Sequence, residues 1–225
     1  MLVRYWMNTN PVSVHADDAM KSAMDLLNTH KFHMLPVLDD NRLVGVVTGQ
    51  DLKRAKTAIA STMDCYDYSE IYLEIKVRSF MSMELVSVSW DLSIEEAAEV
   101  LLGSGISGAP VVDDAGNLVG VITKTDLFKA LISLTGLKKR GVQFGMIVED
   151  KLGATRELIK TISQYGGKIA CVLTSYERAP QGYRRVYLRM YGVDRLKLSE
   201  IKKILGSRAR LLYMLDHREG HREIY

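Results

Sequence analysis

The chain has 225 residues, of which 47% are hydrophobic and 25% charged, a balance typical of a folded globular protein. Its four prolines argue against long disordered segments, and its two cysteines, which have no metal or redox spacing, argue against a disulfide framework. The first residues lack the apolar core of a signal peptide, and no stretch approaches the roughly 18 apolar residues of a membrane span. We therefore expect a cytoplasmic protein with no membrane partner.

The net charge of +3 conceals two halves of opposite sign. Residues 1–137 carry 11 Lys and Arg against 18 Asp and Glu, whereas residues 138–225 carry 19 against 9. This asymmetry predicts a domain boundary near residues 137–142. A basic half also raises nucleic acid as a partner. Because its basic residues are mixed with acids over several elements, we do not expect DNA or RNA binding.

A duplication organises residues 1–135. Val3–Met7 recurs as Val77–Met81, and Leu43–Leu52 recurs as Leu118–Leu127. Each copy predicts a β-α-β-β-α unit, the first over residues 1–60 and the second over residues 75–135. The linker between them is residues 61–74, and its polar part, residues 61–69, is predicted to be a mobile loop.

The helices and turns of the two repeats follow from apolar spacing and turn residues. In the second repeat Ser93 and Glu96 predict a capping box at the start of a helix. The apolar face expected for this helix is Ile94, Ala97, Ala98, Leu101 and Leu102, and the face of its counterpart is Ala19, Met20, Ala23, Leu26 and Leu27. Turns at 39–41 and 113–117 separate the two strands of each repeat, and closing helices are expected near 50–58 and 125–134.

The residues common to both repeats resemble a tandem pair of CBS domains. Each repeat has a hydrophobic-Pro-Val strand, then a Gly-hydrophobic-hydrophobic-Thr-x-x-Asp segment that ends at Asp51 or Asp126. This resemblance implies a pseudo-two-fold disc, a Bateman module, with two clefts for an adenosine-containing ligand. The expected ligand is AMP, ADP, ATP or S-adenosylmethionine, bound as a regulatory ligand and not as a cofactor.

The Thr-x-x-Asp segments offer groups that a nucleotide requires. Asp51 and Asp126 can accept hydrogen bonds from both ribose hydroxyls, as acidic residues do in dinucleotide folds. Thr48 and Thr123 can donate a hydroxyl to phosphate beside a helix N-terminus, where free N–H groups favour anions. The alternative is that both pairs are ordinary helix N-caps that need no ligand.

The two clefts are not expected to be equal. Lys31 and His33 precede the hydrophobic-Pro-Val strand of the first repeat, where basic residues commonly reach phosphate in nucleotide-binding members of the family. We therefore expect the first cleft to be the phosphate-rich one and the second to take a less charged adenosine compound. In the second repeat Lys124 is the expected cation. The remaining candidate nucleotide-binding residues, from the same strands, are Pro36, Ala109 and Pro110.

The second half predicts a ferredoxin-like βαββαβ unit over residues 142–215. The predicted strands are 142–149, 168–175, 184–191 and 209–215, and the predicted helices are 155–165 and 196–205. The turn after the first strand resembles the ligand loop of ACT domains, which implies an amino-acid effector held by Asp150, Leu152, Gly153 and Ala154. The family usually has proline where Leu152 stands, so a packing or dimerisation domain without a ligand stays open as the alternative.

The order of a CBS pair followed by an ACT-like domain resembles the acetoin-utilisation protein B group. Residues 216–225 hold two histidines, too few ligands for a metal site, and are predicted to be a solvated tail. The sequence suggests no catalytic set of residues and no metal spacing, so we expect a regulatory sensor and not an enzyme. Both domain types usually pair, which implies a homodimer. A structural module without ligand and a DNA-associated regulator are the alternatives.

Overall fold

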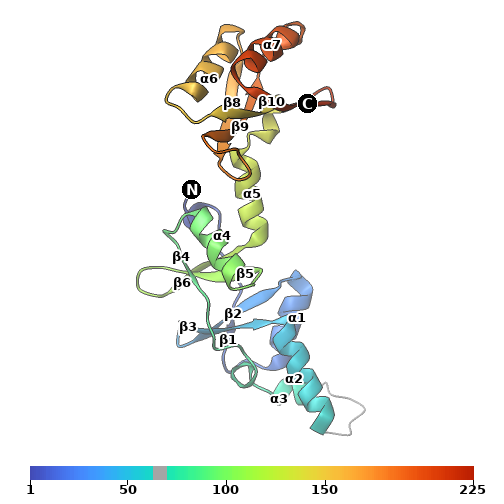
Figure 1. Cartoon of the computed structure of the whole chain (residues 1–225). Coiled ribbons are helices and arrows are strands. Elements are labelled where there is room, and N and C mark those ends of the chain that lie inside the picture. Colours follow the sequence, from blue (N-terminus) through green and yellow to red (C-terminus); the bar gives the residue numbers. More distant parts are fainter. Residues whose placement is uncertain (63–69) are drawn as a thin grey trace. The chain divides into compact units, whose positions relative to one another are not determined.

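The computed structural model describes residues 1–62 and 70–225, which form two compact units, Met1–Ala130 and Leu131–Tyr225 (Figure 1). The first two residues of the predicted loop at 61–69 belong to helix α2. The rest of this loop, which includes Cys65, lies outside the described residues. Among the described residues, no helix has both the length and the apolar character needed to cross a lipid bilayer.

The first unit contains the two predicted repeats, each with a three-stranded sheet. In each sheet a short leading strand pairs in parallel with the central strand, which pairs antiparallel with the third. The first repeat comprises β1 (Val14–His15), α1 (Met20–His30), β2 (Met34–Asp39), β3 (Arg42–Thr48) and α2 (Gly49–Thr62), followed by the short α3 (Ile71–Glu74). The second comprises β4 (Val88–Ser89), α4 (Ile94–Gly103), β5 (Gly108–Val112), β6 (Leu118–Thr123) and α5 (Lys124–Leu134).

The leading segments of the two repeats are exchanged, which the sequence did not predict. Val3 is fully buried in the core of the second repeat, and Val77 is fully buried in the core of the first. Asn8 bridges β6 through Val121, and Ser82 bridges β3 through Val46, each by two backbone hydrogen bonds. The two repeats therefore complete each other's sheets and form one unit.

The predicted helix faces are mostly correct. The capping box of α4 is present, since Ser93 accepts from the Glu96 N–H at 3.1 Å and Glu96 accepts from the Ser93 N–H at 2.8 Å. Ile94, Ala97 and Leu101 are buried, but Leu102 is 70% exposed, so its placement on the buried face was wrong. A residue next to Leu101 is turned about 100° around the helix axis, away from the core.

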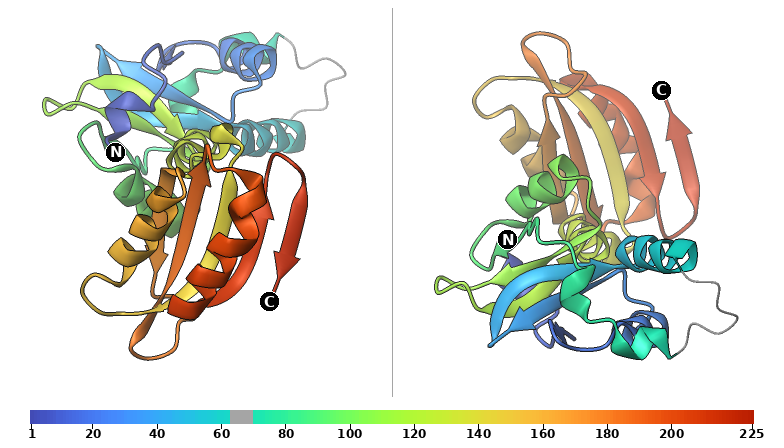
Figure 2. Two further views of the ribbon diagram at one scale, coloured as in Figure 1. Left: turned by 90° about the horizontal axis from the view of Figure 1, so that it is seen from above. Right: turned by 90° about the horizontal axis from the view of Figure 1, so that it is seen from below.

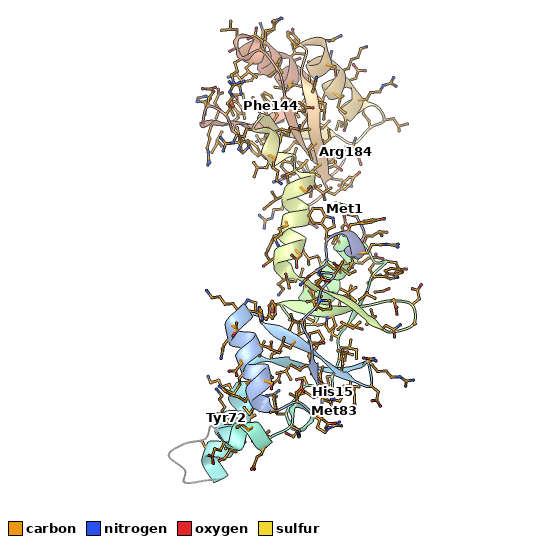
Figure 3. All side chains as sticks on the ribbon, turned by 180° about the vertical axis from the view of Figure 1, so that it is seen from behind. Met1, His15, Tyr72, Met83, Phe144 and Arg184 are labelled. Atoms are coloured by element: carbon orange, nitrogen blue, oxygen red, sulfur yellow. The ribbon has the colours of Figure 1, made fainter. Side chains whose placement is uncertain are left out.

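The second unit is the predicted βαββαβ fold with one added strand. Its elements are β7 (Val142–Glu149), α6 (Ala154–Gln164), β8 (Lys168–Ser175), β9 (Tyr183–Tyr191), α7 (Leu198–Arg208), β10 (Arg210–Asp216) and β11 (His221–Ile224). The antiparallel sheet has the order β11-β10-β7-β9-β8, and both helices cover one of its faces (Figure 2). Phe144 of β7, labelled in Figure 3, is fully buried against these helices with Leu158 and Ile201.

Residues 216–225 are not only a solvated tail. Residues 221–224 form β11, which pairs antiparallel with β10 at the edge of the sheet. Glu223 accepts hydrogen bonds from Lys202 of α7 at 2.8 Å and from the Tyr225 hydroxyl at 2.6 Å. The alternating side chains of a short edge strand give too weak a pattern to distinguish it from a polar tail in sequence.

Candidate functional site

Thr123 and Asp126 form a reciprocal cap where β6 passes into α5. The Asp126 carboxylate accepts from the Thr123 N–H at 3.1 Å and from its hydroxyl at 2.6 Å, while the Asp126 N–H donates to the threonine oxygen at 3.3 Å. These bonds satisfy backbone groups that the start of a helix leaves free. The capping role expected as the alternative is therefore present, and it fixes the carboxylate at the N-terminus of α5.

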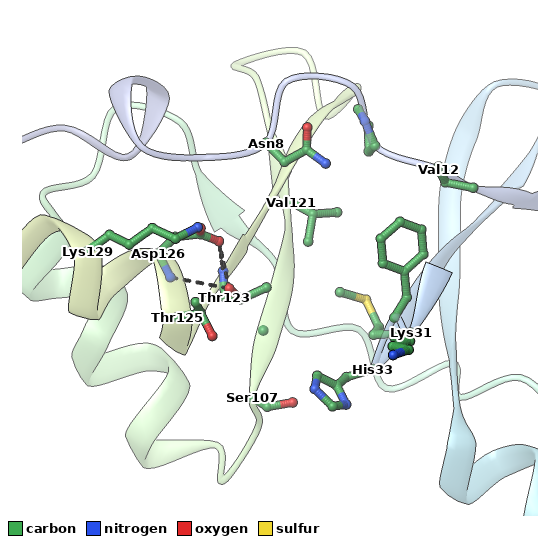
Figure 4. Close-up of a pocket in the computed structure, with 14 residues that line it drawn as sticks. Asn8, Val12, Lys31, His33, Ser107, Val121, Thr123, Thr125, Asp126 and Lys129 are labelled. Carbon is green, nitrogen blue, oxygen red and sulfur yellow. Dashed lines mark hydrogen bonds and ion pairs between the residues drawn. The ribbon is translucent and has the colours of Figure 1, made fainter. Parts of the chain in front are cut away.

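The Thr123–Asp126 pair lines a cleft of about 480 Å³, here called the Asp126 cleft. This volume lies within the roughly 300–1,000 Å³ range of small-molecule sites. One wall comes from β6 and the start of α5, and the facing wall comes from the segment that joins α1 to β2 (Figure 4). The lining residues are Asn8, Pro11, Val12, Lys31, Phe32, His33, Met34, Ser107, Gly108, Val121, Thr123, Thr125, Asp126 and Lys129.

Asp126 keeps hydrogen-bonding capacity toward this cleft. Its side chain is 17% exposed, and among the residues that the structure describes one carboxylate oxygen accepts only from Lys129 Nζ, at 3.0 Å. Lys129 itself is 64% exposed, so its ammonium group can move toward another anion at little cost. A carboxylate has about four acceptor sites, and the contacts found for Asp126 use three of them.

The facing wall supplies two basic side chains. Helix α1 ends at His30, and its C-cap residue Lys31 adopts the left-handed conformation with φ 53° before the chain turns into β2. This turn places Lys31 and His33 in the wall of the cleft, where both are exposed (Figure 4). Between them Phe32 adds an aromatic ring, stacked on His30 with ring centroids 5.0 Å apart.

A second cleft of about 440 Å³ lies at the start of α2, here called the Thr48 cleft. Its lining residues are His33, Met34, Val46, Thr48, Gly49, Gln50, Glu84, Val86, Gly105, Ile106, Ser107, Gly108 and Pro110. Four of them, His33, Met34, Ser107 and Gly108, also line the Asp126 cleft. The two clefts therefore share a wall, made by the first residues of β5 and the residues at the start of β2.

Asp51 is held differently from Asp126. It is only 3% exposed and accepts from the Thr48 N–H at 2.8 Å, from the Thr48 hydroxyl at 2.6 Å and from Ser82 Oγ at 2.9 Å. Arg54 also donates to it. Burial raises the pKa of the Asp51 carboxyl, but the bonds from Thr48, Ser82 and Arg54 outweigh burial and leave this pKa below its ordinary value.

The structure regroups the predicted nucleotide-binding residues. Lys31 lines the cleft of Thr123 and Asp126 and not the cleft of Thr48, whereas His33 lines both. A basic residue before the first repeat's strand therefore lies in the same cleft as the second repeat's Thr–Asp pair. Lys124 is not among the residues that line either cleft, and Lys129 is the cation beside Asp126. Pro110 lines the Thr48 cleft, whereas Pro36 and Ala109 are buried in their strands.

Several lining residues were missed from the sequence. Lys129 carries a signal, because it stands three positions after Asp126 on one helix face. Asn8 and Phe32 carry none, since they reach the Asp126 cleft only through the exchange of leading segments and the turn after α1.

In the second unit, the predicted effector loop joins β7 to α6. Asp150 is paired with Arg184 at 3.4 Å, and Leu152 is fully exposed. Gly153 is the residue before α6 and has φ 83°, a conformation that favours glycine. Ala154 lines a cavity of about 370 Å³ together with Val148, Glu149, Lys151, Glu157, Ser207 and Arg208.

A group of possible metal ligands occurs elsewhere in the first unit. Within the described parts of the chain, the ligand atoms of His15, Asp17 and Asp39 lie within 4.8 Å of one another. Arg78 already contacts both carboxylates of this group, at 2.6 Å and 3.6 Å. These exposed and partly exposed side chains are therefore arranged as a surface ion-pair network.

Comparison with known proteins agrees with the fold of the first unit. The CBS domain model matches residues 3–57 and 77–133. A CBS domain-containing protein of Dictyostelium discoideum is 30% identical over 135 residues, which cover 60% of this chain and 93% of that protein. An inosine-5'-monophosphate dehydrogenase of Aquifex aeolicus is 33% identical over 125 residues, which cover 55% of this chain and 23% of the enzyme. A solved Vibrio cholerae protein described as an acetoin utilization protein, AcuB, shares the fold, with 24% identity, a TM-score of 0.52, and coverage of 62% of this chain and 96% of that one. The chain belongs to the CBS domain-containing proteins, with a tandem pair of these domains in its first unit.

Proposed function

We propose that this chain is a regulatory sensor that binds an adenosine phosphate in the Asp126 cleft. One observation carries the proposal. The accessible carboxylate of Asp126 lies on one wall of the cleft, and the basic residues Lys31 and His33 lie on the facing wall. The cleft would hold its ligand without transforming it, so we propose a binding function and no catalysis.

Each part of an adenosine phosphate has a partner in the cleft. The Asp126 carboxylate would accept from the ribose hydroxyls, using its free acceptor site and the one that Lys129 now occupies. Phe32, Met34 and Val121 supply apolar surface for the adenine ring. Lys31, His33 and Lys129 would donate to phosphate, which the N-terminus of α5 also favours.

Charge favours a phosphate ligand over a sulfonium ligand. The lining of this cleft includes two lysines, Lys31 and Lys129, against one aspartate. A phosphate close to these groups gains charge-assisted hydrogen bonds, whereas the positive sulfonium of S-adenosylmethionine would be repelled. We therefore propose AMP or ADP ahead of S-adenosylmethionine. Each further phosphate adds negative charge that the two lysines balance less well and that the acidic first half of the chain would oppose at long range, so we place ATP after AMP and ADP.

The finer parts of the sensor are further proposals. A homodimer would bury the exposed apolar face of α5, where Phe128, Leu131 and Ile132 are 63%, 51% and 46% exposed. The loop of Asp150 to Ala154 would receive the carboxylate of an amino-acid effector at the N-terminus of α6, beside Arg184, whose Nε atom is buried without a partner among the described residues.

Nucleic-acid binding through the basic second half has less support. Many of its cations are paired with acids, as in Lys151 with Glu149, Arg195 with Asp216, and Lys202 with Glu223. Cations that are paired with acids attract the phosphates of a nucleic acid less strongly than an open basic face does. The structural alternative, in which the Thr–Asp pairs only cap helices, is what the experiment must exclude.

Thermal unfolding of ligand-stripped protein tests the proposal. AMP or ADP at 100 times its dissociation constant should add about 2.7 kcal/mol to the free energy of unfolding. Asp126→Ala should abolish this increment, measured against the variant's own unliganded melting temperature because the substitution also removes a helix cap. Asp114→Ala, in an exposed turn, is the matched control and should keep the full increment. An unchanged melting temperature with every adenosine compound would leave the Thr–Asp pairs as caps alone and refute the sensor.

A further inference from the structure

We infer that the Thr48 cleft is closed to nucleotides by Ser82 and Glu84, so that each chain binds one nucleotide and not two. The inference rests on the proposed function of the Asp126 cleft and adds the residues that make the two clefts unequal. It reverses the sequence-based assignment of Asp51 to ribose.

Ser82 and Asn8 occupy equivalent places in the two repeats. Ser82 bridges Val46 of β3, and Asn8 bridges Val121 of β6, through the same pair of backbone hydrogen bonds. Only the serine reaches the neighbouring aspartate, donating from Oγ to Asp51 at 2.9 Å. The Asn8 side chain instead accepts from the Asn10 N–H at 3.1 Å, and among the described residues Asp126 accepts from Thr123 and Lys129.

The contacts of Asp51 fill its acceptor capacity. One carboxylate oxygen accepts from the backbone and hydroxyl of Thr48, and the other accepts from Ser82 and Arg54. These four bonds match the roughly four acceptor sites of a carboxylate. The side chain is 3% exposed, against 17% for Asp126, and Asp51 is not part of the lining of the Thr48 cleft. A ribose would have to displace Ser82 or Arg54 to reach it.

The charge of the Thr48 cleft also opposes a phosphate. Of the described residues that line it, Glu84 is the acidic one and none is a lysine or arginine. Lys31 lies in the Asp126 cleft, and His33 belongs to the shared wall and can turn its imidazole toward only one ligand at a time. A nucleotide in the Thr48 cleft would therefore meet a carboxylate where the other cleft offers two ammonium groups.

Calorimetric titration of the full chain with AMP tests this inference. We expect one equivalent per chain, an affinity lost in Asp126→Ala, and an affinity changed by less than threefold in Asp51→Asn, which keeps an acceptor for Thr48. The double variant Ser82→Asn with Glu84→Lys should gain a second, weaker equivalent, because it copies Asn8 and adds a cation at an exposed position.

The outcomes separate this inference from the proposed function. Two equivalents in the unaltered chain, one of which is lost in an Asp51→Asn variant that still unfolds cooperatively, would overturn the inference alone. Loss of a single equivalent in Asp51→Asn, with binding kept in Asp126→Ala, would place the nucleotide in the other cleft and overturn the proposed function as well. An unchanged single equivalent in a folded double variant would also overturn it, since Ser82 and Glu84 would then not be what closes the cleft. Absence of binding by the unaltered chain would overturn the proposed function and this inference together.

Discussion

Replacement of Lys31 by alanine tests the phosphate role of the Asp126 cleft. A charge-assisted hydrogen bond contributes about 1.5–3 kcal/mol. Lys31 is exposed at the end of α1, so water and salt screen it, and we take the lower value. About 1.4 kcal/mol corresponds to a tenfold change in a binding constant. Lys31→Ala should therefore weaken AMP binding about tenfold and leave adenosine binding within twofold.

The assay is calorimetric titration of both ligands into the unaltered chain, Lys31→Ala and a control, Lys53→Ala. Lys53 is an exposed lysine on α2 that lines neither cleft, so its removal changes the net charge equally without touching the site. Raising the salt concentration should weaken AMP binding by the unaltered chain more than by Lys31→Ala. An equal loss for AMP and adenosine, or an equal loss in Lys53→Ala, would refute the assignment of Lys31 to phosphate.

Three further predictions concern the stability of the two units. Phe144→Ala should destabilise the second unit by about 3–5 kcal/mol in urea unfolding, since the ring is fully buried, and a loss under 1 kcal/mol would contradict this packing. Ser93→Ala should cost about 1 kcal/mol by removing the cap of α4, measured in the same way, and Asp114→Ala, outside any cap, should cost less than half as much. Hydrogen bonds from Lys202, Tyr225 and His221 lower the pKa of Glu223 from 4.5 to about 2, so the stability it contributes is full above pH 4.5 and is lost as pH falls toward 2. Glu223→Gln should therefore be less stable than the unaltered chain near pH 6 and approach it near pH 2, and a difference independent of pH would contradict the coupling.

The fold could be predicted largely because local signals repeat. Two copies of Gly-hydrophobic-hydrophobic-Thr-x-x-Asp mark the same strand-to-helix junction, and the structure has a reciprocal Thr–Asp cap at both. The alternation of Val186, Leu188 and Met190 with arginines likewise indicated β9, which begins one residue earlier than predicted, and β7 and β8 have the predicted bounds. Such patterns depend on the spacing of side chains within a single helix or strand, which can be read directly from the sequence.

The arrangement of the clefts could not be predicted, because it depends on how the repeats meet. Lys31 belongs to the first repeat in sequence but lines the cleft of Asp126 in the second. Ser82 bonds Asp51 only because the segment after the linker returns to β3. The difference between a serine and an asparagine at equivalent positions carries no meaning until that exchange is known.

A crystal structure of the chain grown with AMP tests the central claim most directly. We predict the ribose hydroxyls within about 2.7–3.2 Å of the Asp126 carboxylate, with the phosphate contacting Lys31 or Lys129. A nucleotide bound at Asp51, or at a surface away from both clefts while the Asp126 cleft stays empty, would contradict the account.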